Sequence, residues 1–179
     1  MEEKYLLPAL DLVRSVFAAS ESAESADFVV RLIKEIRSKR YYIPELELVM
    51  VDENDEVIGY AMFSRWHLGG EHENELLILT PVAVKTELQR QHISKDLIEY
   101  GFKKAREMGF KAVQVEGNPK NYESRGFRPS YEFEIVAGPK IKLPRPECLM
   151  YRELIPGALD EISGVVDYSF YDTLMEEEG

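Results

Sequence analysis

The chain has 179 residues, enough for one domain with a sizeable hydrophobic core. Its net charge of −11 argues against a nucleic-acid-binding surface, and fits either a cationic substrate or solubility alone. One cysteine excludes an intramolecular disulfide, three scattered histidines without a CxxC pair disfavour a structural metal site, and no apolar run is long enough to span a membrane. We therefore expect a cytoplasmic protein without metal, nucleic-acid or membrane partners.

The N-terminal third predicts two helices and a β-hairpin. Apolar residues recur at helical spacing over about residues 6–19 and 24–38, and a serine near the start of the second segment could cap it. The polar run Asp52–Asp55 is typical of a hairpin turn, which would join a strand over residues 46–51 to a return strand over about residues 56–66. We expect Trp66 in the core and the neighbouring His67 at the surface.

A strand over residues 76–84 follows, and it carries a proline in its middle. Pro81 cannot donate to a sheet ladder, so a bulge or splay is expected there. A splayed strand leaves N–H and C=O groups of Val82 and Val84 unpaired, and a linear amide ligand can pair with such groups as an extra strand.

The next stretch completes a βαβ unit. A helical stripe begins at Ile93 and ends just before Gly109, a suitable residue for the position past a helix end. A buried strand is predicted over residues 110–115, and Asn118 and Pro119 then form the start of a short helix. Because free backbone N–H groups point outward from a helix N-terminus, the start of the long helix is a natural anion site.

The C-terminal third predicts strands over residues 131–136 and 147–154 and a last short strand near residues 165–168. The acidic residues 173–179 are expected to be a disordered tail. Residues 1–172 would then form a single domain. No strand is evident before Leu6.

Three motifs occur in order along the chain. They are Val82-Ala83-Val84 with Gln89-Arg90-Gln91-His92-Ile93-Ser94, then Gly117-Asn118-Pro119-Lys120-Asn121-Tyr122-Glu123-Ser124-Arg125-Gly126-Phe127, and then Leu154-Ile155-Pro156-Gly157-Ala158-Leu159 with Ser163-Gly164-Val165-Val166-Asp167-Tyr168. In these motifs the chain resembles the GNAT superfamily of acetyl-CoA-dependent N-acetyltransferases and, more narrowly, its YhbS-like bacterial branch.

The resemblance implies both a fold and a function. The fold is mixed α/β (α+β), with a mostly antiparallel sheet of six to seven strands, helices on both faces, and a splay at the central strands. The function is transfer of an acetyl group from acetyl-CoA to a primary amine of a small molecule or peptide, by direct attack in a ternary complex. The alternative is a catalytically degenerate GNAT-like domain that binds CoA ligands or a protein partner. A homodimer is left open.

The resemblance also implies a set of acetyl-CoA contacts: Val82, Ala83, Val84, Gln89, Arg90, Gln91, His92, Ile93, Ser94, Lys95 and Asn118. Two of these positions depart from the family pattern, since Ser94 replaces glycine or alanine and His92 replaces glycine. The His92 imidazole could crowd the pyrophosphate, pair with a phosphate when charged, or point away.

Two residues are candidates for proton transfer. The resemblance implies that Tyr122 lies near the acetyl-CoA sulfur and reprotonates the thiolate, and the alternative is a core tyrosine bonded to backbone. Glu75 begins the central strand, where a carboxylate could take a proton from the attacking amine. The alternative for Glu75 is a solvated acidic loop.

Overall fold

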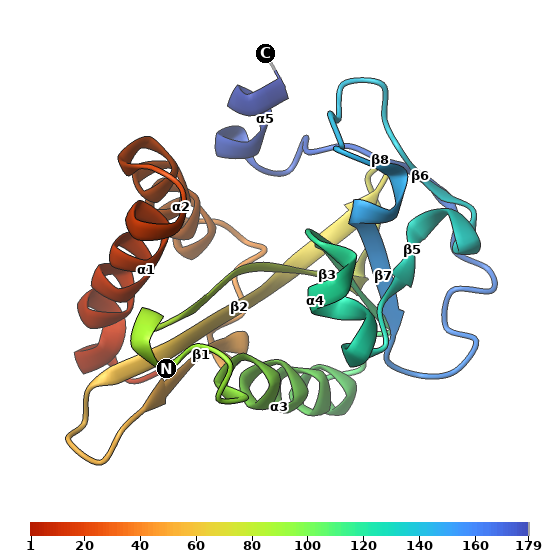
Figure 1. Cartoon of the computed structure of the whole chain (residues 1–179). Helices are drawn as coiled ribbons and strands as arrows, with labels where there is room; N and C mark the ends of the chain where they lie inside the picture. Colours follow the sequence, from red (N-terminus) through yellow and green to blue (C-terminus); the bar gives the residue numbers. More distant parts are fainter. Residues whose placement is uncertain (179) are drawn as a thin grey trace. The chain divides into compact units, whose positions relative to one another are not determined.

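The computed structural model describes residues 1–178 (Figure 1). Short connections join most of its helices and strands. The α-helices are α1 (Leu6–Ser20), α2 (Ala23–Ser38), α3 (Ile93–Glu107), α4 (Pro119–Tyr122) and α5 (Asp172–Glu178). The strands are β1 (Glu47–Val51), β2 (Val57–Leu68), β3 (Glu71–Val84), β4 (Ala112–Glu116), β5 (Arg128–Pro129), β6 (Ile135–Ala137), β7 (Leu149–Glu153) and β8 (Gly164–Val166).

Six of these strands form one mixed sheet in the order β1-β2-β3-β4-β7-β5, and β6 and β8 form a parallel pair. The pairs β1–β2, β4–β7 and β5–β7 are antiparallel. β3 and β4 are parallel and are joined through α3, as a βαβ connection requires. The predicted mixed, mostly antiparallel sheet is therefore confirmed.

By its internal contacts the chain divides into two compact units, each of which is described by itself. The first unit contains residues 1–64 and 80–104, and the second contains residues 65–79 and the rest of the chain from residue 105. β2 and β3 each contribute residues to both units.

In the first unit, α3 packs against one face of β2. A β-carbon added to Gly59 would lie 2.6 Å from Cγ2 of Ile93, and one added to Gly101 would lie 2.2 Å from the Phe63 ring. These two glycines therefore let the helix and the strand approach closely. Because Gly59 and Phe63 are four residues apart on a strand, they share that face.

The opposite face of β1 and β2 carries a buried carboxylate that joins them to α2. Glu47 is buried and opposes Met62 in the β1–β2 register. Its Oε1 accepts hydrogen bonds from Arg37 of α2, at 2.9 and 2.6 Å, and from the Tyr60 hydroxyl at 2.8 Å. Its Oε2 accepts from the Tyr42 hydroxyl. α2 and α3 thus lie on opposite faces of the hairpin within this unit.

Most predicted elements of the N-terminal half are confirmed. The Ser22 hydroxyl caps α2 by accepting from the N–H of Ser25 at 3.0 Å. The side chain of Asp52 organises the hairpin turn, since its Oδ1 accepts from the N–H groups of Asn54 and Glu56. In the described residues no strand precedes α1, and a single 3-10 turn stands there instead.

Three predictions of secondary structure differ from the structure. The strand predicted over residues 131–136 is wrong: Ser130–Phe133 form a 3-10 turn and Glu134 has a positive φ of 57°, which breaks the extended pattern before β6. β3 begins at Glu71 instead of Leu76. The tail expected to be disordered over residues 173–179 is helical as far as Glu178, and its Gly179 lies outside the described residues.

The core of the second unit contains polar atoms as well as rings. Gln114 of β4 is buried, and its Oε1 accepts from Trp66 Nε1 at 2.9 Å and from the Tyr151 hydroxyl. Tyr171 stacks on Trp66, so the predicted core position of Trp66 is confirmed. The surface position predicted for His67 is wrong, because its ring is buried and stacks on Phe170.

Candidate active site

The carboxyl end of β3 extends beyond its pairing with β4. The parallel register joins Leu76–Ile78 to Ala112–Gln114, and β3 continues to Val84 without a further register partner on β4. Ala83 is buried, whereas Val82 and Val84 are half-buried. A cis peptide bond precedes Pro81. The pairing of β3 with β4 ends at Ile78, before Pro81, which agrees with the splay predicted around this proline.

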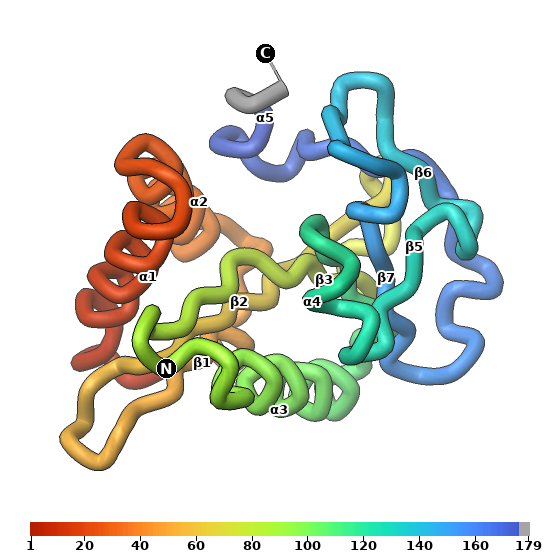
Figure 2. Tube along the Cα trace, in the orientation of Figure 1, coloured from red at the N-terminus to blue at the C-terminus, as the bar shows by residue number. Residues whose placement is uncertain are grey.

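The loop between β3 and α3 is fixed at its start. The N–H of Lys85 donates to the carbonyl of Ile58 at 2.9 Å, and its ammonium lies 3.3 Å from Glu56 and 3.5 Å from Glu87. Figure 2 shows the trace running from the end of β3 into α3, and the 3-10 turn Thr86–Leu88 lies between them. Gln89 Nε2 lies 3.5 Å from the carbonyl of Val84, at the outer limit of a hydrogen bond.

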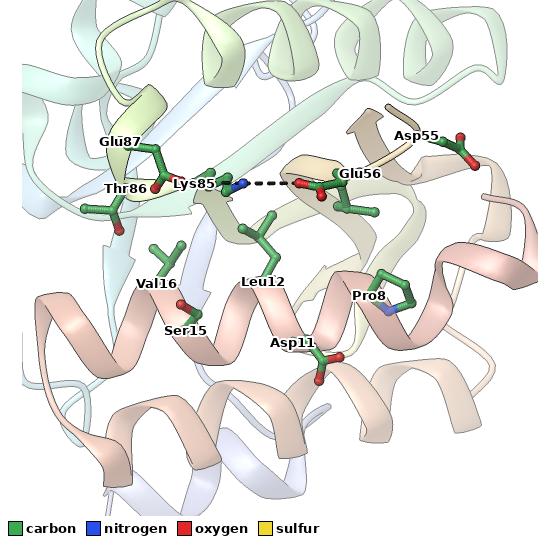
Figure 3. A pocket seen from close by; sticks show the side chains of 11 residues that line it. Pro8, Asp11, Leu12, Ser15, Val16, Asp55, Glu56, Lys85, Thr86 and Glu87 are labelled. Carbon is green, nitrogen blue, oxygen red and sulfur yellow. Dashed lines mark hydrogen bonds and ion pairs between the residues drawn. The ribbon is translucent and has the colours of Figure 1, made fainter. Parts of the chain in front are cut away.

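A pocket of about 520 Å³ lies beside the start of this loop (Figure 3). One wall is α1, and the other walls are the hairpin and the residues that follow β3. Its lining residues are Pro8, Asp11, Leu12, Ser15, Val16, Asp55, Glu56, Val57, Lys85, Thr86 and Glu87. The carboxylates are partly neutralised, because Lys85 pairs with Glu56 and Glu87 and because Lys4 pairs with Asp55 at 2.7 Å. The pocket is therefore lined jointly by the loop, the hairpin and α1, and the Lys85–Glu56 pair links the loop to the hairpin.

The second half of the loop turns through two left-handed residues. Arg90 and His92 both have a φ of 65°, in a region that favours glycine. Both side chains are exposed. His92, the residue just before α3, therefore holds a left-handed backbone conformation although it has a β-carbon.

α3 begins immediately after His92. The N–H of Asp96 donates to the carbonyl of His92 at 2.9 Å, which closes the first helical turn. The side chain of Ile93 is buried against β2, so only its backbone faces the loop. Lys95 is exposed and Ser94 is half-buried. A helix N-terminus with an adjacent arginine and lysine favours an anion.

In the second unit, Asn118 and Tyr122 lie at the two ends of α4. Asn118 caps the helix by accepting from the N–H of Lys120 at 3.1 Å, as predicted. The Tyr122 ring meets Phe127 edge-on, and burial raises the pKa of its phenol against a smaller opposing effect of Arg125. Among residues 1–175, whose side chains the structure describes, the Tyr122 hydroxyl has no hydrogen-bond partner. The phenolic proton of Tyr122 is therefore not used in a hydrogen bond among these residues.

Glu75 is engaged in two ion pairs. Its Oε1 lies 2.5 Å from the Lys111 ammonium, and its Oε2 lies 2.6 Å from His72 Nδ1. These partners, Lys111 first, hold the pKa of Glu75 below its ordinary value. The lower pKa makes the Glu75 carboxylate a weaker base than a free glutamate.

One carboxylate near the start of α4 has no motif that indicates it in the sequence. Glu116 is the last residue of β4, and one of its oxygens accepts from the Tyr168 hydroxyl. The contact joins residues 52 positions apart, so no local pattern indicates it. The only signal in the sequence is a carboxylate at the end of a buried strand, two residues before a helix cap.

The described residues contain neither a candidate metal site nor a membrane-spanning helix. Among them, no group of three or more histidine, cysteine, aspartate or glutamate side chains lies close enough to hold a metal ion. No helix within the same residues has the length and apolar character needed to cross a membrane.

Residues 14–128 match the model of the acetyltransferase (GNAT) family. The chain belongs to this family. It is 26% identical over 144 residues to the uncharacterized N-acetyltransferase YhbS of Escherichia coli K12, a match that covers 80% of this chain and 82% of YhbS. The family predicted from the three motifs is confirmed.

Solved structures of the GNAT family show the same fold. The structure of YhbS from Escherichia coli in complex with CoA has a TM-score of 0.76 at 24% identity, covering 89% of this chain and 84% of YhbS. A GNAT family acetyltransferase from Brucella melitensis in complex with acetyl-CoA has a TM-score of 0.70 at 19% identity, covering 95% of this chain and 94% of the other. The roles of individual site residues remain predictions.

Proposed function

We propose that this GNAT protein transfers the acetyl group of acetyl-CoA to a primary amine of a small molecule or peptide. The observation that carries the proposal is the path of residues 82–95, which run from a strand end without a β4 partner, through a loop with two left-handed residues, into the N-terminus of α3. The E. coli and Brucella relatives were crystallised with CoA and acetyl-CoA, respectively, which supports the same donor here.

The residues of this path fit the parts of the donor. Val82 and Val84 supply backbone groups that can pair with the amides of the pantetheine arm. The N–H groups of the first turn of α3 face the pyrophosphate, and the exposed Arg90 and Lys95 add positive charge beside it. Ala83 and Ile93 contribute through backbone groups only, because both side chains are buried.

Tyr122 supplies the proton for the leaving thiolate. The nitrogen of the neutral amine attacks the thioester carbonyl carbon, the C–S bond breaks, and the sulfur takes the phenolic proton. The nitrogen loses a proton as the amide forms, and this proton restores the phenol. Starting from an ammonium ion, the products are an N-acetyl amine, a thiol and one proton released to solvent. Orienting the two reactants supplies much of the rate.

The test of Tyr122 is the variant Tyr122→Phe, which keeps the ring and removes the proton. Because its hydroxyl has no partner among the described residues, the melting temperature and acetyl-CoA affinity should stay near wild type. Loss of a general acid should lower kcat by roughly 10²–10⁴. The measurement is steady-state acetylation of an amine panel beside thermal melts.

The matched control is Tyr131→Phe, the same change at an exposed tyrosine of the second unit. It should leave the rate unchanged. A Tyr122→Phe enzyme as fast as wild type would remove this tyrosine from the mechanism, and a lower melting temperature with intact turnover would make it a core residue.

One observation favours a second candidate, a degenerate domain that binds CoA ligands or a protein partner without turnover. His92 places a β-carbon and a ring where the family has glycine. If the ring crowds the pyrophosphate, His92→Gly should tighten acetyl-CoA binding. If it pairs with phosphate, the same change should weaken binding, most at low pH where imidazole is charged.

A cytoplasmic location and a homodimer are further parts of the proposal. Neither affects the chemistry above. Size-exclusion chromatography with light scattering measures the oligomeric state, and cell fractionation measures the location.

A further inference from the structure

Glu116 lies at the carboxyl end of β4, the place where ligands bind in sheets with parallel strands. β4 pairs with β3 only as far as Gln114, whereas Glu116 pairs with Leu149 of β7. Glu116 therefore has a strand neighbour on one side only. Because Gln114 and Glu116 are two residues apart on the strand, their side chains share a face.

The carboxylate of Glu116 is held at one oxygen and open at the other. Its Oε2 accepts from the Tyr168 hydroxyl, and its Oε1 has no partner among residues 1–175, whose side chains the structure describes. The side chain reaches solvent. Tyr168 is itself anchored, since its ring lies 5.9 Å from the buried Trp66 ring. Glu116 thus has a fixed direction and a free lone pair.

The neighbouring residue, Gly117, places the proposed acid at the end of the same strand. A β-carbon added to Gly117 would lie 2.9 Å from Cε2 of the Tyr122 ring, so the absence of a side chain lets that ring lie against the end of β4. Because successive side chains of an extended chain point to opposite sides, Glu116 and the ring of Tyr122 lie on opposite sides of the end of β4.

We propose that Glu116 is the base that takes the proton from the acceptor ammonium, with Tyr168 as its positioning residue; this rests on the proposed acetyl transfer. The carboxylate removes one proton from the ammonium and passes it to solvent, which leaves a neutral amine with its lone pair free to attack. The second proton leaves the nitrogen as the amide forms and restores the phenol of Tyr122. One proton is released overall, as the reaction requires.

The electrostatic surroundings suit Glu116 better than Glu75 for this role. Burial raises the pKa of Glu116, and the hydrogen bond from Tyr168 opposes that rise. Among the described residues Tyr168 is the titratable group in contact with Glu116, and the β7 residue opposite is the apolar Leu149. Glu75 has both oxygens in ion pairs and a lowered pKa.

The experiment is the pH profile of kcat/KM for a good amine acceptor in wild type, Glu116→Gln and Tyr168→Phe. In wild type, kcat/KM should fall towards low pH, and the midpoint of this acid limb should lie above the ordinary glutamate pKa of about 4.3. Glu116→Gln should lose that limb and fall roughly 10²–10⁴ in kcat/KM, with acetyl-CoA binding unchanged. Tyr168→Phe removes the hydrogen bond that lowers the pKa of Glu116, so the limb should move to higher pH.

A control variant and three outcomes separate a failure of the Glu116 role from a failure of the proposed acetyl transfer. Glu161→Gln, the same change at an exposed turn residue, should behave as wild type. An acid limb that survives in Glu116→Gln, or that disappears in Glu75→Gln instead, overturns the inference while leaving the acetyl transfer intact. If Glu116→Gln fails to fold, an unmoved limb in Tyr168→Phe overturns it. Absence of turnover by wild type on every amine would instead contradict the proposed function.

Discussion

His92 and Arg90 show how single residues set the shape of the loop between β3 and α3. Each holds a φ of 65°, which costs a residue with a β-carbon about 1–2 kcal/mol relative to ordinary backbone. Histidine is among the residues that tolerate this region better than most. A glycine at position 92 would adopt this backbone conformation without that cost.

A stability comparison at position 92 tests this explanation. His92→Gly should be more stable than His92→Ala by roughly 0.5–1 kcal/mol, because relief of the left-handed cost outweighs the backbone entropy of glycine, about 0.5–1 kcal/mol. The measurement is the free energy of unfolding in urea. Equal stabilities, or a more stable alanine variant, would show that the loop does not hold residue 92 at positive φ in solution.

Residues with local roles were predictable from sequence, and residues with distant partners were not. The caps Ser22 and Asn118 follow from patterns a few residues long. The contact of Glu116 with Tyr168 joins a strand end to a segment 52 residues later. No periodicity or spacing in one sequence carries that information.

At the scale of elements, α2 is attached to β1 by an ion pair with a buried carboxylate. The side chain of Arg37 is 17% exposed and that of Glu47 is fully buried. Removing one partner of such a pair leaves a charge buried without full compensation, which costs more than the pair contributes. The helix and the hairpin should therefore lose stability together when this contact is broken.

Arg37→Gln should lower the free energy of unfolding by about 3 kcal/mol, the low end of the range for a broken buried pair, because the hydroxyls of Tyr42 and Tyr60 still donate to Glu47. The control is Arg14→Gln, which breaks the exposed pair with Asp27 and should cost less than about 1 kcal/mol. Similar losses in the two variants, measured by urea unfolding, would contradict the buried role.

Element prediction succeeded where periodicity was strong and failed where backbone geometry intervened. The stripes of α1, α2 and α3 gave helix bounds within about two residues. Residues 131–136 alternate like a strand, yet the left-handed Glu134 separates a 3-10 turn from β6. A positive φ at a non-glycine residue has no reliable signal in composition.

At the scale of the whole molecule, the motif order predicted the family and the sheet, and both are confirmed. The position of the donor along the βαβ connection stays a prediction. The acceptor was beyond prediction, because the charge of −11 fits solubility as well as a cationic substrate. The partition into two compact units also had no sequence signal, since β2 and β3 run through both.

The central claim is acetyl transfer from acetyl-CoA to a primary amine, and product analysis tests it most directly. Purified protein is incubated with acetyl-CoA and a panel of small and peptide amines, and free thiol and N-acetyl amine are quantified together, beside a melt with acetyl-CoA. We predict equal molar amounts of both products with at least one amine, and a melt stabilised by about 2.7 kcal/mol at a hundredfold excess over Kd. A stabilised melt with no acetylated amine across the panel would contradict the enzyme and support a CoA-binding domain.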